Sequence, residues 1–211
     1  RDNTQPGSKA PGGAASEGMI APASASAPAE IRVLRRHLAT CVDLVTQRGL
    51  YLSGDEAIKR TNEATSAAID VERVSVWFLE AGGRKIRCAD LFERGPRRHS
   101  SGVELHQKDF APYFAALARE RTIAAHDARR DPRTSCFTTS YLEPLGIGAL
   151  LDVPIWQHGQ MIGVVCHEHL GGPRTWNSDE ETFAYLVANF VALALDRRGA
   201  GSSSESGRRA R

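Results

Sequence analysis

Four side chains that can bind or react stand in a row at the end of an apolar run. They are Cys166, His167, Glu168 and His169, directly after the segment MIGVV. Side chains alternate across a β-strand, so His167 and His169 share one face and Cys166 and Glu168 share the other. Two imidazoles on one face can contact a ligand or share a metal ion. The simpler alternative is two histidines hydrogen-bonded at a strand end.

The strand that carries this row is predicted to be one half of a hairpin. Residues 147–156 and 161–170 are two long apolar runs joined by a short polar segment, residues 157–160, that contains Gly159. Gly159 can supply the positive φ that a tight turn needs. Two apolar runs this close together predict the centre of a β-sheet.

The remaining elements predict an α+β domain. Apolar residues three and four positions apart predict helices, and alternating apolar residues predict strands. The predicted helices are 30–48, 55–69, about 110–120 and 178–197, with a short helix over 136–145. The predicted strands are 73–79, 85–92 and 122–125, and 93–103 is predicted as a loop. Strands that follow one another through short turns, as in hairpins, favour a mainly antiparallel sheet with helices on its faces.

Three N-terminal helix caps are also predicted. Ser53 with Glu56 and Ser178 with Glu181 have the spacing of capping boxes. Asp109 precedes the helix expected at about 110, and its carboxylate can accept hydrogen bonds from the first N–H groups of that helix.

Composition narrows the class of protein. The chain has 211 residues and a net charge of +2, with scattered arginines, so we expect no nucleic-acid partner. No apolar run approaches the ~20 residues of a membrane span, so we expect no membrane partner. The four cysteines form no close pairs and indicate free thiols in a reducing, cytoplasmic compartment. Residues 1–29 and 199–211 are rich in small and polar residues, so we expect disordered tails around one folded domain at 30–198.

A family resemblance emerges from two segments. RVSVWFLEAGGRKIRCADLFE, residues 73–93, resembles the opening hairpin of a GAF domain, and residues 121–195 resemble its second half. The resemblance covers about 31–197 and is strongest to GAF domains upstream of bacterial sensor kinases and diguanylate cyclases. It implies a GAF/PAS-like antiparallel sheet of about six strands with helices on both faces. One face would carry a ligand cavity, and the other a dimerising helix layer.

The resemblance implies a function in sensing. It predicts a non-catalytic domain that binds a small molecule and signals to a partner or output domain, such as a kinase or cyclase. The homodimer would form through residues 31–48 and 178–197. A ligand-free dimerisation module is the alternative. One GAF branch is an enzyme, free methionine-(R)-sulfoxide reductase, but its characteristic cysteine segment is absent here, so we expect no enzyme activity.

The resemblance also implies where a ligand binds. Cys166-His167 matches a run in phytochrome-like GAF domains, so we expect His167 and His169 to line the cavity and Cys166 to face the helix layer. The other expected ligand contacts lie on the short roofing helix and on the first two strands. They are Phe137, Tyr141, Leu142, Trp77 and Asp90, with Asp90 sharing a face with Cys88. Core packing is the alternative for Phe137, Tyr141 and Leu142, and a solvent-facing sheet edge is the alternative for Asp90.

Cys136 lies near the bilin-attaching cysteine of photosensory GAF domains. Its spacing to Tyr141 is five residues where the bilin pattern has four, and Phe137 replaces the usual histidine. We therefore expect neither bilin nor haem and leave the cofactor open. Asp131, before Pro132, is predicted to cap a turn, and Arg133 to pair with a carboxylate there.

Overall fold

The computed structural model describes residues 28–46 and 54–206, with side chains as far as residue 195. Its helices and helical turns are α1 Ala29–Thr46, α2 Gly54–Ile69, η2 Ala81–Gly83, α3 Ala111–Leu117, η3 Ser135–Phe137, η4 Thr138–Leu142, α4 Glu143–Leu145 and α5 Ser178–Ser206. Its strands are β1 Arg73–Glu80, β2 Lys85–Glu93, β3 Arg98–Ser100, β4 Glu104–His106, β5 Ile123–Ala125, β6 Ile147–Gln157 and β7 Gln160–Leu170.

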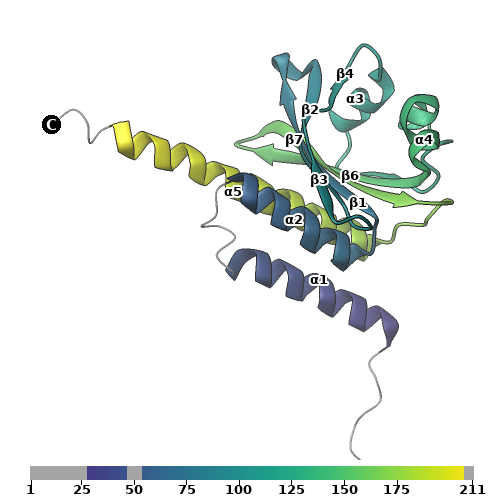
Figure 1. Cartoon of the computed structure of the whole chain (residues 1–211), viewed down its shortest axis with the longest axis horizontal. Helices are drawn as coiled ribbons and strands as arrows, with labels where there is room; N and C mark the ends of the chain where they lie inside the picture. Colours follow the sequence, from purple (N-terminus) through teal and green to yellow (C-terminus); the bar gives the residue numbers. More distant parts are fainter. Residues whose placement is uncertain (1–27, 47–53, 207–211) are drawn as a thin grey trace, which may run out of the picture.

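One antiparallel sheet organises the described part of the chain (Figure 1). Its strands follow the order β3-β2-β1-β7-β6-β5, and β4 pairs with β2 beside β3. The predicted hairpin is confirmed, because β6 and β7 pair along their whole length and lie inside the sheet. Gly159 has φ +76° in its turn, as expected. The α+β class with helices on both faces is therefore correct.

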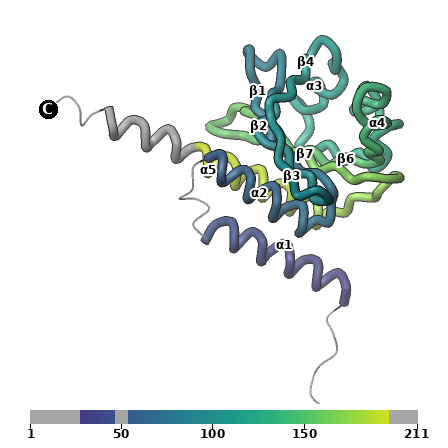
Figure 2. The backbone as a smooth tube through the Cα atoms, in the orientation of Figure 1, coloured from purple at the N-terminus to yellow at the C-terminus, as the bar shows by residue number. Residues whose placement is uncertain are grey.

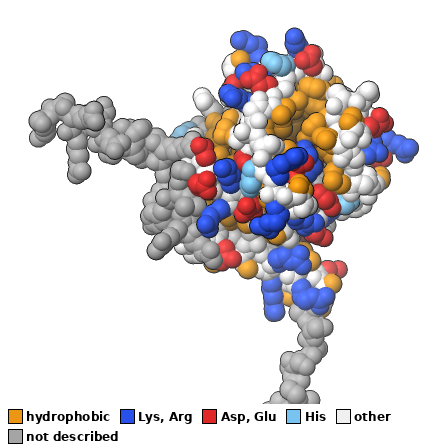
Figure 3. Space-filling view, in the orientation of Figure 1, with side chains coloured by type: hydrophobic (Ala, Val, Ile, Leu, Met, Phe, Trp, Pro, Cys, Tyr) orange, Lys and Arg blue, Asp and Glu red, His pale blue; other side chains and the backbone are white. Residues whose placement is uncertain are grey.

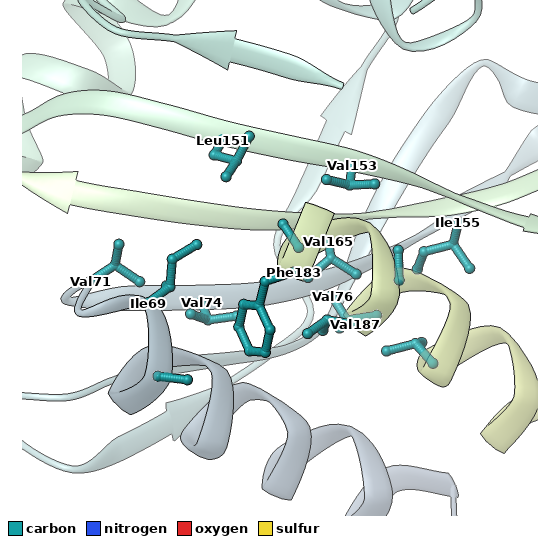
Figure 4. Packing of buried hydrophobic residues seen from close by; sticks show 14 of the residues in the cluster. Ile69, Val71, Val74, Val76, Leu151, Val153, Ile155, Val165, Phe183 and Val187 are labelled. Atoms are coloured by element: carbon teal, nitrogen blue, oxygen red, sulfur yellow. The ribbon is translucent and has the colours of Figure 1, made fainter. Parts of the chain in front are cut away.

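Helices α2 and α5 cover one face of the sheet, and α1 lies outside them (Figures 1 and 2). The core on this side contains Val74 and Val76 of β1, Val153 of β6, Val165 of β7 and Phe183 of α5. Figure 4 shows these side chains pointing into the space between strands and helices. β-Branched residues suit this layer, because they pack well on a pleated surface.

The opposite face is covered by short pieces rather than long helices. α3, η3, η4 and α4 lie over it, and a second buried cluster joins them to the sheet. The segment predicted as one short helix at 136–145 is in fact three turns of different pitch, η3, η4 and α4. Gly146 ends them in the left-handed region at φ +71°.

Several boundaries differ from the predictions. The predicted loop at 93–103 contains β3, and β4 follows it, because three-residue edge strands are too short to show a period. Asp109 does not cap α3, whose N-cap is Phe110 without a side-chain hydrogen bond. The predicted stop of the first helix and the cap at Ser53 lie outside the described residues.

The cap of α5 lies one residue earlier than predicted. Asn177 Oδ1 accepts from the main-chain N–H groups of Asp179 and Glu180, both at 3.0 Å. The Glu180 carboxylate accepts in return from the N–H of Asn177 at 3.0 Å. This is a capping box built on Asn177 and Glu180 rather than on Ser178 and Glu181.

Candidate functional site

A small cavity lies between the sheet and the turns that cover its second face. Its volume is about 20 Å³. Walls come from five strands of the sheet and from three elements of the covering layer, α3, η3 and η4. The lining residues are Trp77, Ile86, Leu105, Tyr113, Phe137, Tyr141, Leu150, Asp152, Cys166 and Glu168. On the molecule's surface, hydrophobic side chains gather around α3 (Figure 3).

Four aromatic side chains form much of the wall. Tyr113 meets Phe137 edge-on with ring centroids 4.9 Å apart, and Phe137 meets Tyr141 at 6.4 Å. Trp77 comes from the sheet, where its indole N–H donates to Ser75 Oγ at 2.8 Å. The cavity is therefore mainly apolar, with ring faces and edges available to a guest.

Glu168 is a carboxylate in the wall that already has a cation. Arg73 Nε donates to one of its oxygens at 2.5 Å, and the Tyr141 hydroxyl donates to the other at 2.7 Å. Arg73 also contacts Glu93 at 2.8 Å. Burial, followed by the nearby Glu168 charge, raises the pKa of Tyr141 well above its usual range. Both oxygens of Glu168 are thus occupied by groups of the chain.

Asp152 is a carboxylate in the wall that pairs with no cation among the described residues. The Tyr113 hydroxyl donates to Oδ2 at 2.6 Å, and Oδ1 has no hydrogen-bond partner among the described residues. The side chain is only 2% exposed. Burial raises the pKa of Asp152 to about 7, against the lowering effect of the Tyr113 hydrogen bond. The Cys166 thiol lies beside this pair, 3.7 Å from the Tyr113 hydroxyl.

The structure brings three of the predicted ligand contacts together. Trp77, Phe137 and Tyr141 all line the cavity. Leu142 is completely buried in the adjoining core but does not line the cavity. The short covering segment was thus correctly placed, although only two of its three named residues reach the cavity wall.

The predicted directions of His167 and Cys166 are wrong and must be exchanged. His167 pairs in register with Val74 and Leu151, which belong to the core under α2 and α5. Its Nδ1 donates to the Leu151 carbonyl at 2.6 Å, its Nε2 has no partner among the described residues, and burial lowers its pKa to about 4. Cys166 lines the cavity instead. The period of two separates the faces of a strand but does not say which face the helices cover.

His169 does not reach the cavity either. It lies on the same face as His167, half-buried, with Nδ1 3.2 Å from a carboxylate oxygen of Glu72. No group of three or more potential metal ligands occurs within residues 28–46 and 54–195.

Asp90 points away from the cavity because of a β-bulge. Between β1 and β2 the register shifts, so that Val76 faces Asp90 while Trp77 faces Cys88. The extra residue turns Asp90 to the helix side, opposite to Cys88. There its oxygens accept from Asn62 Nδ2 of α2 at 2.8 Å and lie 3.0 Å from His99 Nδ1. The prediction that Asp90 lines the cavity is therefore wrong.

The main residue that the sequence predictions missed is Asp152. It is the one acid in the apolar run IGALLDVPIW, and the hairpin register places it opposite Cys166. An acid in the middle of a central strand is unusual enough to have indicated a site. Tyr113 and Leu105 carried no such signal, because only the tertiary fold brings α3 and β4 to this place.

The loop before the covering turns is structural, as predicted. Asp131 Oδ1 accepts from the N–H of Arg133 at 2.9 Å, and the Arg133 guanidinium contacts Asp131 and Glu120, both at 2.6 Å. The Cys136 thiol is half-buried, lies 3.9 Å from the Arg133 carbonyl and has a pKa raised by burial.

The fold and cavity define a class: an α+β domain with a small cavity between an antiparallel sheet and a covering layer of short turns. Residues 53–195 match the model of the GAF domain family. The match spans more than half of the chain, so the chain belongs to the GAF domain family. None of the curated proteins compared with it is a match.

Solved structures support the same fold. One is the GAF domain of a phosphoenolpyruvate-protein phosphotransferase (ptsP) from Coxiella burnetii, with a TM-score of 0.64, 15% identity, and coverage of 81% of this chain and 98% of that one. The phycoerythrobilin-bound GAF domain of a cyanobacterial phytochrome has a TM-score of 0.67 at 15% identity, covering 80% and 98%. The PixJ GAF domain of Thermosynechococcus elongatus has a TM-score of 0.62 at 16% identity, with coverage of 79% of this chain and 99% of that one. At these identities the likeness concerns the fold alone.

No helix in the described ranges is both long and apolar enough to cross a membrane.

Proposed function

We propose that this chain is a sensory domain that binds a small molecule in the cavity and passes binding to a partner or output domain. The observation that carries the proposal is the cavity's wall, in which aromatic rings surround a few polar groups. Concave, mainly apolar sites with few polar groups are typical of small-molecule binding.

The central strand β7 connects the cavity directly to the helix layer, because its two faces contact one each. Cys166 and Glu168 lie on its cavity face, while Val165 and His167 lie under the helices on its other face. A guest that displaces the strand by a fraction of an ångström would disturb both layers, because both are tightly packed. The signal would then reach α5.

The helix layer presents an apolar surface for a second copy. On α1, the side chains of Ile31, Leu34, Leu38, Val42 and Val45 are between 42% and 58% exposed. On α5, Leu186 and Leu193 are 45% and 58% exposed. Their spacing of three and four residues suits helix pairing across a two-fold axis. We propose a homodimer through these helices, with a signalling kinase or cyclase as a candidate partner.

The thiols favour binding over catalysis. Burial raises the pKa of Cys88 to about 12, and that of Cys166 well above its usual range. Protonated, buried thiols are weak nucleophiles, whereas thiol-based sulfoxide reduction needs a thiolate. This supports a regulatory rather than enzymatic domain.

A native mass spectrum of the purified protein tests ligand binding. We expect added mass per subunit that disappears on denaturation and is lost in Phe137→Ala, which removes one wall of the cavity. Leu145→Ala, an exposed side chain on α4, is the control and should keep the added mass. Added mass retained in Phe137→Ala would place the guest elsewhere.

A ligand-free dimerisation module is the second candidate. The small volume of the cavity favours it, since about 20 Å³ leaves room for little more than one water-sized guest. A dimer without added mass, and without response to any small molecule, would favour this function.

A further inference from the structure

The polar atoms of the cavity wall are chiefly acceptors. Asp152 and Glu168 contribute carboxylates, and their partners Tyr113 and Tyr141 already use their hydroxyl protons on them. The cation in the neighbourhood, Arg73, is held by Glu168 and Glu93. An incoming acceptor would find few free donors here, and an incoming anion would meet two carboxylates.

One of these acceptors stands out because it lacks a partner. Asp152 lines the cavity, and its Oδ1 atom is buried and makes no hydrogen bond within the described residues. A buried acceptor without a donor is costly, and a buried charge without a counter-charge is costlier still. A guest that is both a donor and a cation would remove both costs.

The aromatic rings favour the same kind of guest. Tyr113, Phe137, Tyr141 and Trp77 surround the space beside Asp152. A cation is attracted to the faces of such rings, most strongly where water is excluded. An ammonium group has three donors and no acceptor, which suits a wall composed of acceptors and rings.

We propose that the cavity binds the ammonium head group of a small primary amine, which pairs with Asp152 and packs against the surrounding aromatic rings. The inference rests on the proposed function and specifies its ligand class. The cavity volume of about 20 Å³ exceeds the roughly 10–15 Å³ that one water requires, so an ammonium group, which is close to a water in size, fits without movement of the wall. A planar tetrapyrrole would require the covering turns to open.

The binding should depend on pH through Asp152. Tyr113 from α3, and Cys166 and Glu168 from β7, are the titratable groups that act on this carboxyl. Burial raises its pKa to about 7, whereas a primary amine stays protonated to about pH 10. Affinity should therefore rise roughly tenfold from pH 6 to pH 8, as Asp152 ionises.

The test uses methylammonium chloride as the probe, with methanol as the neutral control and sodium acetate as the anionic one. The readout is the ¹⁵N–¹H indole signal of Trp77, with the exposed Trp156 as an internal reference. We expect methylammonium alone to shift the Trp77 signal saturably. Asp152→Asn should weaken this binding about tenfold or more, the loss expected for a hydrogen bond to a charged group. Asp109→Asn, an exposed acid just before α3, should leave it unchanged.

Four results would overturn the inference. Equal binding of methanol or acetate would show a site for a neutral or anionic guest, and the proposed sensory function would stand. Methylammonium binding that is unchanged in Asp152→Asn, or independent of pH in the unaltered protein, would also refute it. The pH titration keeps the test decisive even if Asp152→Asn fails to fold. A Trp77 signal that no probe moves would count against both the inference and the proposed function.

Discussion

Asp152 shows how one buried carboxyl affects both stability and binding. Its pKa is raised from 3.8 to about 7, and burial is the main cause. The unfolded chain loses this proton near pH 4, whereas the folded domain holds it to about pH 7. The carboxyl therefore costs nothing below pH 4, becomes increasingly destabilising from pH 4 to 7, and reaches a constant cost above that.

Replacing Asp152 by asparagine should therefore stabilise the ligand-free domain at pH 8. The pKa shift corresponds to up to about 4 kcal/mol, and an unpaired amide N–H would offset about 2 kcal/mol of it, leaving about 2 kcal/mol. Urea unfolding of both proteins from pH 4 to pH 8 measures this. At pH 4 the cost of the carboxyl is almost absent, so the variant should be the less stable protein by up to about 2 kcal/mol, and the two curves should cross between pH 4 and pH 8. A variant less stable than the parent at pH 8 would show that the ionised carboxylate does not lower the free energy of unfolding.

At the scale of single residues, the sequence predicted types of contact better than their directions. Trp77, Phe137 and Tyr141 were placed correctly because bulky aromatic residues on a half-buried strand or turn usually face a core. His167 and Cys166 alternate as predicted, yet each faces the other layer. Both faces of β7 are apolar, so alternation alone could not decide between them.

At the scale of elements, the end of β2 is held to α2 by a chain of polar contacts. His99 Nδ1 lies 3.0 Å from Asp90, and its Nε2 lies 3.1 Å from Glu63 of α2. Asn62 of α2 donates to the same Asp90. Burial alone would lower the pKa of His99, but the hydrogen bonds to Asp90 and Glu63 outweigh it and the net pKa is raised.

These contacts predict a second pH effect on stability. Protonated His99 stabilises the fold below its ordinary pKa near 6.5, and this contribution is lost as pH rises through the raised pKa of the folded state. His99→Gln should remove about 1 kcal/mol at pH 6 and much less at pH 9. The measurement is thermal unfolding of both proteins at the two pH values. An equal loss at both would mean that the charge of His99 contributes nothing.

The cap of α5 gives a prediction with a matched control. Asn177→Ala should cost about 1 kcal/mol, because two N–H groups of the first turn lose their acceptor. Ser178→Ala, one residue on, should have little effect, since the Ser178 hydroxyl does not cap the helix in the structure. Denaturant unfolding compares the two variants. A larger loss of stability in Ser178→Ala than in Asn177→Ala would support the capping box predicted from sequence instead.

The element boundaries show where local patterns reach their limit. The long hairpin and the amphipathic helices were predictable, because eleven-residue apolar strands and repeated spacings leave strong signals. β3 and β4 were not, because their three residues pair at an edge and carry no period. The bulge that turns Asp90 toward α2 also leaves no local signal, since it depends on how β1 and β2 align.

At the scale of the whole molecule, the exposed stripe on α1 and α5 predicts the state of assembly. On α1, Leu34, Leu38 and Val42 are exposed, while His37 and Leu44 face the domain instead. Leu38→Glu together with Leu193→Glu should convert a dimer to a monomer, because charges would replace the apolar contact between copies. Sedimentation velocity measures the change.

Val103→Glu serves as the control for this prediction. Val103 is also 54% exposed, but it directly precedes β4, and Figure 1 shows β4 well apart from α1. This variant should remain a dimer. A dimer that persists in the double variant would exclude the α1–α5 surface as the interface.

The most direct test of the central claim is to follow the three tryptophan indole signals during titration with small cations, neutral molecules and carboxylates. Trp77 lines the cavity, Trp156 is exposed near the hairpin turn, and Trp176 is buried on the helix side. We predict that the Trp77 indole signal shifts saturably with at least one class of probe, most strongly with amines. The Trp156 signal should not shift. A Trp77 signal that stays constant with every class would contradict the account of this cavity as a ligand site.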